Sequence, residues 1–294
     1  MSCADENVCA NCGIAGVDEI KLKVCDGGCD LVKYCSKKCR EDHREQHHEE
    51  CKRRAKELHD KRLFTQPDGI YLGECPICFL PNPIDAAKTT FMSCCGQTIC
   101  RGCMYAHAMS NIHDTMKAAA CLFCRTSALD EGEYDKRAQE RIDANDPAVL
   151  CYRGTESYQA GDYDKALKYL TKAAELGDAE AHFHLGYMNM EGVGVEKDKE
   201  RGVYHYEKAS IGGHPKARAR LACFEADNGN MDKAAKHFII AANIGDEASM
   251  KTLLTFYKKG VITKQEYGAT LRTHQAAVDA TKSSQRDAAE KDFD

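Results

Sequence analysis

The sequence predicts a multidomain chain in which two small metal-stabilised modules are followed by an all-α helix–turn–helix repeat solenoid. Three observations support this fold class. Sixteen of the 18 cysteines of the 294-residue chain lie between Cys3 and Cys124. Fourteen of these sixteen stand in seven pairs at short spacings, as metal ligands do. Beyond them, a segment ending in glycine recurs at intervals of 36 and 32 residues, which is the period of stacked helical hairpins.

The sequence composition indicates the cellular compartment of the chain and excludes some classes of partner. The N-terminus lacks the basic start and apolar run of a secretory signal, and no apolar stretch approaches the roughly 20 residues that span a bilayer. We therefore expect an intracellular chain, cytoplasmic or nuclear, without a membrane partner. Thiols stay reduced there, so clustered cysteines indicate metal ligands and not disulfides. A formal net charge of −5 argues against nucleic acid as a partner.

The first module contains four ligand pairs at spacings that let two side chains converge on one ion. Zinc prefers four sulfur or nitrogen ligands in a tetrahedron, so eight ligands predict two zinc sites. The alternatives are redox-active or buried free cysteines, and His43 or His48 in place of His47. We favour His47 because it lies one helical turn before Cys51. The pairs are Cys9 and Cys12, Cys25 and Cys29, Cys35 and Cys39, and His47 and Cys51.

Residues 9–51 resemble a MYND finger. The resemblance rests on Cys-x2-Cys, then Tyr34-Cys35-Ser36-Lys37-Lys38-Cys39, then seven residues to His47-x3-Cys51. It implies interleaved sites, with Cys9, Cys12, Cys35 and Cys39 on one ion and Cys25, Cys29, His47 and Cys51 on the other. It also implies that the module binds short peptides of partner proteins and carries no catalytic residue.

The second module contains eight cysteines. Three pairs are Cys-x2-Cys knuckles, which is a strong zinc signal. The fourth pair is adjacent, so the backbone must turn both thiolates toward one ion, and Gly96 directly after it supplies the needed freedom. The pairs are Cys75 and Cys78, Cys94 and Cys95, Cys100 and Cys103, and Cys121 and Cys124.

Residues 74–126 resemble an all-cysteine RING finger in the order and spacing of these pairs. The resemblance implies that Cys75, Cys78, Cys100 and Cys103 hold one ion and that Cys94, Cys95, Cys121 and Cys124 hold the other. His107 or His113 is the alternative ligand if one cysteine of the adjacent pair does not bind. A RING has no nucleophile but positions a ubiquitin-charged conjugating enzyme, and the expected contacts to that enzyme are Ile77, Leu122 and Arg125.

The sequence pattern predicts about four helical hairpins over residues 146–281. Glu191-Gly192-Val193-Gly194-Val195, with Asp198, Tyr206 and Ala209, resembles a Sel1-like repeat of the tetratricopeptide superfamily. Such a stack shares one continuous core, and its concave face commonly binds proteins. Asp146 and Pro147 predict a helix start. The residues assigned to packing are Tyr169, Leu170, Leu185, Tyr206 and Phe238, with Cys151 and Cys223 as small core residues.

Three connecting segments complete the prediction. A basic helical connector is expected over residues 52–62, and a charged linker with a short helix over 126–147. The polar tail after Thr281 is expected to be frayed, and Cys3 is assigned to an N-terminal tail.

The lead functional hypothesis is a RING-type ubiquitin ligase with four zinc ions per chain. Its MYND finger and repeats would select protein substrates or peptide motifs, while its RING recruits a ubiquitin-conjugating enzyme. The alternative is a non-catalytic zinc-binding adaptor for protein–protein interaction.

Overall fold

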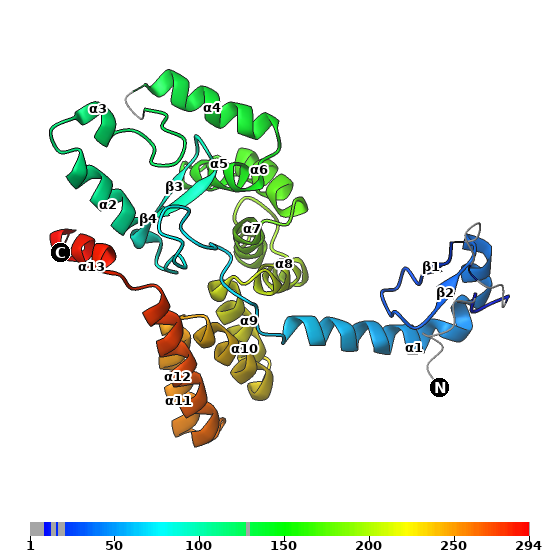
Figure 1. The fold of residues 1–294 in the computed structure, drawn as a ribbon. Coiled ribbons are helices and arrows are strands. Elements are labelled where there is room, and N and C mark those ends of the chain that lie inside the picture. Colours follow the sequence, from blue (N-terminus) through cyan, green and yellow to red (C-terminus); the bar gives the residue numbers. More distant parts are fainter. Residues whose placement is uncertain (1–8, 13–15, 17–20, 128–129, 294) are drawn as a thin grey trace. The chain divides into compact units, whose positions relative to one another are not determined.

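The computed structural model of the chain describes residues 9–12, 16, 21–127 and 130–293. The chain divides into two compact units, Met1–Thr65 and Gln66–Asp294. Figure 1 follows it from the first cysteine-rich module, in blue, to the last helices, in red. The second cysteine-rich module and the helical repeats share the second unit. No helix in the described part of the chain has the length and apolar character that crossing a membrane requires.

The first unit contains a short antiparallel hairpin and one long helix. The helix begins at Ser36, whose hydroxyl accepts a 3.2 Å hydrogen bond from the backbone N–H of Cys39. This N-cap satisfies a donor that the first helical turn leaves open. The helix continues through residues 52–62, which confirms the predicted helical connector. The elements are β1 (Lys23–Val24), β2 (Lys33–Tyr34) and α1 (Lys37–Leu63).

The second cysteine-rich module is built around an antiparallel hairpin and the helix that follows it. The turn of the hairpin carries Cys94 and Cys95, and Gly96 completes it with a φ of +68°. A Cβ at Gly96 would lie 2.9 Å from Arg141 Nη2 and from Asp146 Oδ2. The predicted need for glycine after the adjacent cysteines is therefore confirmed. The elements are η2 (Ala86–Lys88), β3 (Thr89–Met92), β4 (Gln97–Cys100), α2 (Arg101–Ser110) and α3 (Thr115–Ala118).

Regular helices occupy the rest of the second unit. Aspartate side chains cap six of them, at Asp130, Asp146, Asp162, Asp178, Asp198 and Asp246. The predicted helix start at Asp146 and Pro147 is confirmed, and the charged linker contains α4. The helices are α4 (Glu131–Asp143), α5 (Pro147–Gln159), α6 (Tyr163–Glu175), α7 (Ala179–Glu191), α8 (Lys199–Ile211), α9 (Pro215–Asp227), α10 (Met231–Asn243), α11 (Glu247–Lys258), α12 (Lys264–Ala280) and α13 (Ser284–Phe293).

Glycines separate successive hairpins of helices. Gly177, Gly213 and Gly245 have φ values of +90°, +83° and +101°, a backbone region that side chains with a Cβ disfavour. Each glycine stands one residue before the N-cap of the next helix. The recurring glycine in the sequence therefore marks the turn that connects one repeat to the next.

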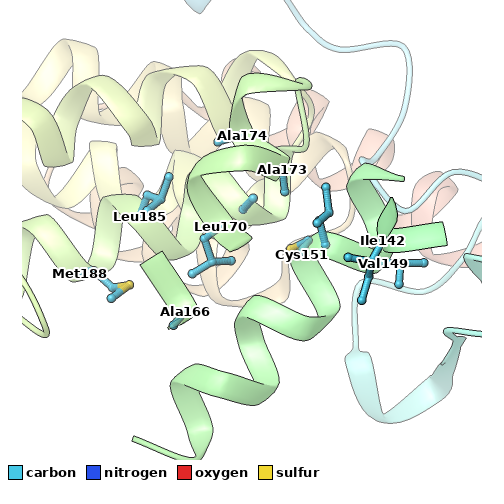
Figure 2. Packing of buried hydrophobic residues seen from close by; sticks show 11 residues of the cluster. Ile142, Val149, Cys151, Ala166, Leu170, Ala173, Ala174, Leu185 and Met188 are labelled. Carbon is cyan, nitrogen blue, oxygen red and sulfur yellow. The ribbon is translucent and has the colours of Figure 1, made fainter. Parts of the chain in front are cut away.

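Clusters of buried residues join neighbouring hairpins. Figure 2 shows one of them, which includes Leu170, Leu185 and Met188 from α6 and α7. Phe238 packs against Phe256 in a second cluster, with ring centroids 5.5 Å apart at 81°. Of the five residues assigned to packing, four are buried, and only Tyr169 is half-buried against the first cluster: Tyr169, Leu170, Leu185, Tyr206 and Phe238.

The segment before and within the second module runs along the turns between repeats. The ring of Tyr71 stacks on His214 at 4.4 Å, next to the Gly213 turn. Ile84 Cδ1 would lie 3.5 Å from a Cβ at Gly245. At the start of the array, Phe91 of β3 packs against Tyr152 of α5 at 5.1 Å. This edge of the repeats is therefore covered by the chain itself.

Two expectations for the periphery are wrong. The residues after Thr281 are not frayed, because α13 packs against α2 of the second module and buries Ala289. Cys223 is exposed and not a core residue, whereas Cys151 is buried as predicted. Cys3 lies outside the described residues.

Candidate metal centres

The first unit brings its eight predicted ligands together as two sets of four. Within each set, the sulfur and nitrogen atoms all lie within 4.8 Å of one another. Cys12 Sγ is 3.5 Å from Cys35 Sγ, and Cys35 Sγ is 3.7 Å from Cys39 Sγ. The sets are interleaved along the chain as the resemblance implies: Cys9, Cys12, Cys35 and Cys39 form one, and Cys25, Cys29, His47 and Cys51 form the other.

Helix α1 selects the imidazole of the second set. His47 Nε2 lies 3.0 Å from Cys29 Sγ, and His47 is buried. His43 is one turn earlier and stacks on His47, but its Nδ1 is hydrogen-bonded at 3.0 Å to the hydroxyl of Tyr34. His48 points elsewhere and is exposed. The structure thus places His47, and neither rival histidine, with the three cysteines.

The second module also forms two interleaved sets, and both consist of cysteines alone. Cys78 Sγ lies 3.8 Å from Cys100 Sγ, and Cys95 Sγ lies 3.7 Å from Cys121 Sγ. His107 is not part of either set, because its Nε2 is 2.8 Å from the carbonyl of Lys117. The sets are Cys75, Cys78, Cys100 and Cys103, and Cys94, Cys95, Cys121 and Cys124.

The spacing of the ligand atoms fits a tetrahedral zinc ion. With Zn–S bonds of about 2.3 Å, the edge of a regular ZnS4 tetrahedron is about 3.8 Å long. Seven sulfur–sulfur separations within the four sets lie between 3.4 Å, for Cys94 and Cys124, and 3.9 Å, for Cys75 and Cys103, and all ligand atoms of a set lie within 4.8 Å of one another. These separations are far longer than the 2.05 Å of a disulfide bond. The donor types and their distances therefore suit zinc.

The thiols of one set do not ionise independently when no cation compensates their charge. Hydrogen bonding from Cys95 lowers the pKa of Cys121 to about 4, while burial and the neighbouring thiols raise the pKa of Cys94 to about 12. One thiolate of the set is stabilised because neighbouring thiols stay protonated and donate hydrogen bonds to it. A bound divalent cation would allow all four to deprotonate, which ties metal binding to the folding of the module.

A side chain outside the ligand sets reaches one of the thiols. Arg286 of α13 is 6% exposed, and its Nη2 donates to Cys78 Sγ at 3.4 Å. Its Nη1 donates to the carbonyls of Pro81 at 2.7 Å and Thr281 at 2.6 Å. Gly102 of α2 permits this approach, because a Cβ there would lie 2.8 Å from the backbone N of Arg286. No signal in the polar C-terminal sequence pointed to this contact.

The three residues expected to contact a conjugating enzyme have different environments. Ile77 is 38% exposed, and Arg125 is exposed with a φ of +65°. Leu122 is 8% exposed and packs in the core of the second module, so it offers little surface to a partner. Phe79 was not singled out in the sequence, yet it is 73% exposed beside the first knuckle.

Curated relatives share part of the chain. DAP3-binding cell death enhancer 1 of Rattus norvegicus is 26% identical over 164 residues, and its counterpart of Mus musculus is 25% identical over 166 residues. The matches cover 42% and 43% of this chain and 32% of each relative. The match therefore spans about a third of the length of these relatives.

Two solved structures are similar to part of the chain. One is a Sel1 repeat protein from Oxalobacter formigenes, 23% identical with a TM-score of 0.39, covering 50% of this chain and 63% of that one. The other is a protective antigen of uropathogenic Escherichia coli with an SLR fold, 19% identical with a TM-score of 0.43. It covers 61% of this chain and 38% of that one.

Family models match two parts of the chain. The MYND finger model matches residues 9–51, and the Sel1 repeat model matches residues 148–178, 179–214 and 215–246. No RING family model matches the second cysteine cluster. The chain therefore contains a zinc-binding MYND finger, a second cysteine module whose two ligand sets could hold metal ions, and Sel1 repeats.

Proposed function

We propose that this protein is a non-catalytic, zinc-stabilised adaptor that brings protein partners together through its MYND finger and its Sel1 repeats. The observation that carries the proposal is the presence of both domains in one chain. MYND fingers bind short peptides of partner proteins, and helical repeats present extended protein-binding surfaces. The relative named DAP3-binding cell death enhancer 1 is described by its name as binding a protein, and this similarity supports a protein-binding role.

Metal has a structural part in this proposal. The buried cluster of the second module is made mostly of its cysteines, with Met92, Ile99 and Leu122. A core of this size supplies little stability, so zinc binding would supply much of the rest. We propose four zinc ions per chain, an intracellular location, and no membrane or nucleic-acid partner.

The second candidate function is a RING-type ubiquitin ligase. It is favoured by the two interleaved sets of cysteines and by the exposed Ile77 and Phe79 beside the first set. A guanidinium such as that of Arg125 can donate to carbonyls on two partners at once. The burial of Leu122 and the docking of α13 on α2 weigh against it, since both reduce the surface available to a conjugating enzyme.

A ubiquitin-transfer assay separates the two functions. The full chain is mixed with ubiquitin, activating enzyme and a panel of conjugating enzymes, alongside Ile77→Ala and Arg125→Ala. The adaptor proposal predicts no ubiquitin chains with any conjugating enzyme. Chains that wild type forms and both variants lose would overturn the adaptor and support the ligase.

A binding experiment tests the adaptor directly. The full chain and a Cys35→Ser variant, which loses one MYND ligand, are expressed in cells, and their co-purifying proteins are compared. The adaptor predicts that the variant loses one group of partners while it keeps those bound by the repeats. Identical partner sets would contradict separate binding surfaces on the two domains.

A further inference from the structure

The repeats contain a groove on α6, α7 and α8. The cavity there has a volume of about 620 Å³. Leu167 and Leu185 form part of its apolar base, and Asn189 adds a buried amide. We call it the α6–α8 groove. No residue of the segment that covers the Gly213 and Gly245 turns lines this groove, so that segment does not fill it.

Basic side chains dominate the charged lining of the α6–α8 groove. Arg201 and Lys208 of α8 line it, and the Lys208 ammonium lies 5.5 Å from the centre of the exposed Tyr204 ring. The lining contains one carboxylate, that of Glu175. Among the residues that the structure describes, no ion pair is recorded for Arg201 or Lys208. Two fixed positive charges therefore remain available to a ligand.

Two imidazoles meet inside the groove. His182 Nδ1 of α7 lies 2.9 Å from His205 Nδ1 of α8, so one ring must donate and the other accept. Burial lowers the pKa of both, that of His205 to about 4, and the positive charges of Arg201 and Lys208 lower them further. The pair is therefore neutral at physiological pH in the free protein, and an anion in the groove would favour its protonation.

The positive charge of the α6–α8 groove contrasts with the negative net charge of the chain. The formal net charge is −5, so the protein as a whole repels an acidic ligand. A basic groove on such a chain distinguishes an acidic partner from basic and neutral ones. Its volume of about 620 Å³, its lining from three helices and its apolar base suit a peptide better than a small anion.

We propose that the α6–α8 groove binds an acidic peptide segment of a protein partner. Carboxylates of that segment pair with Arg201 and Lys208, and its apolar side chains pack on Leu167 and Leu185. The proposal rests on the adaptor function and names the class of partner that the repeats take. The two histidines add a pH dependence, because the complex binds protons that the free groove does not.

The test uses a fluorescein-labelled Glu-Glu-Leu-Glu-Asp-Leu-Glu-Glu peptide and fluorescence anisotropy with the full zinc-loaded chain. The double variant Arg201→Gln with Lys208→Gln is expected to bind the peptide about tenfold or more weakly than wild type. The matched control is Lys233→Gln with Lys251→Gln, which removes two exposed lysines from α10 and α11. Equal loss in both double variants, or none in the first, would overturn the proposal.

A pH titration gives a second readout that does not depend on these variants. Groups facing the two imidazoles are Glu175 from α6 and Arg201, Tyr204 and Lys208 from α8. Since the complex takes up protons, wild-type affinity is expected to rise as pH falls from about 7.5 to about 5.5. A His182→Gln and His205→Gln variant should lose this slope.

The opposite slope in wild type would overturn the proposal. Ubiquitin transfer in the assay above would remove the adaptor function without changing peptide binding, so the two failures can be told apart.

Discussion

At the scale of single residues, the local backbone brings the two members of a ligand pair together. His47 and Cys51 share a face of α1 because they are one turn apart, and such pairs can be recognised from spacing alone. The choice among three histidines needed the structure, since Tyr34 holds His43 away from the ligand set. Which pairs combine is a long-range property, and the interleaving followed only from the family resemblance.

Two helical glycines of the repeats allow a test of packing, because replacing them with alanine should change the free energy of unfolding in opposite directions. Gly186 in α7 faces the ring of Tyr206, and a Cβ there would lie 2.5 Å from its Cδ1. Gly268 in α12 has open space, with its nearest atom, Arg272 Nη1, at 3.7 Å. We expect Gly186→Ala to destabilise the repeats by roughly 1–3 kcal/mol through overpacking. Gly268→Ala should stabilise them by up to about 1 kcal/mol through helix propensity.

Urea unfolding followed by circular dichroism measures both changes. Equal effects of the two substitutions would show that the tight contact between α7 and α8 does not constrain the sequence at Gly186.

Buried histidine in α10 makes the stability of the repeats pH-dependent. Burial lowers the pKa of His237 from 6.5 to about 3. Between those values the unfolded chain binds a proton that the folded chain does not, so stability is lost as pH falls. The limiting slope from this group is about 1.4 kcal/mol per pH unit. Urea unfolding between about pH 7 and about pH 5 should show a shallower slope for His237→Gln.

Identical slopes for wild type and His237→Gln would contradict the account.

At the scale of elements, sequence patterns located the repeats well and the last helix poorly. The helices of the repeats can be located in the sequence from the recurring Asp at their N-caps and the glycines after their last turns. Both residues act on the backbone next to them. Helix α13 has no comparable signal. Its docking depends on Arg286 and on carbonyls of Pro81 and Leu80, which lie about two hundred residues earlier. A polar tail therefore looked frayed in the sequence although it packs on the second module.

Helix α13 should protect the metal set that contains Cys78. Arg286→Ala removes donors to Cys78 Sγ and to three carbonyls. Removing a residue that hydrogen-bonds to a metal ligand typically weakens metal affinity about 10- to 100-fold. We therefore expect faster loss of one zinc ion per chain to a colorimetric chelator, together with faster proteolysis near residue 284.

The exposed Arg272 of α12 supplies the control, since Arg272→Ala should release zinc at the wild-type rate. Equal rates for the two variants would rule out the link between α13 and the metal set.

At the scale of the whole molecule, the order of the domains could be predicted but the contacts within the second unit could not. Cysteine spacing and the repeat period gave a MYND finger, a second cysteine module and a solenoid. They did not reveal that segment 69–84 covers the inter-repeat turns. Stacking of Tyr71 on His214 joins residues 143 positions apart, which no local pattern encodes. The segment thereby covers the Gly213 and Gly245 turns, whereas none of its residues lines the α6–α8 groove.

Chelation should separate the metal-dependent and metal-independent parts of the chain. The repeats have their own clusters of buried aliphatic and aromatic residues, whereas the modules depend on cysteine clusters. A strong zinc chelator is expected to expose residues 9–124 to proteolysis while most helical circular dichroism remains. Complete loss of the helical signal would contradict the independence of the repeats.

Fifteen thiolates and one imidazole are gathered in four sets, which we propose to be four tetrahedral zinc sites. Native mass spectrometry of the purified full chain, with elemental analysis of the same sample, tests it most directly. The account predicts four zinc atoms per chain, all lost on acidification. A chain that carries far fewer zinc atoms, with its cysteines free or oxidised, would contradict it.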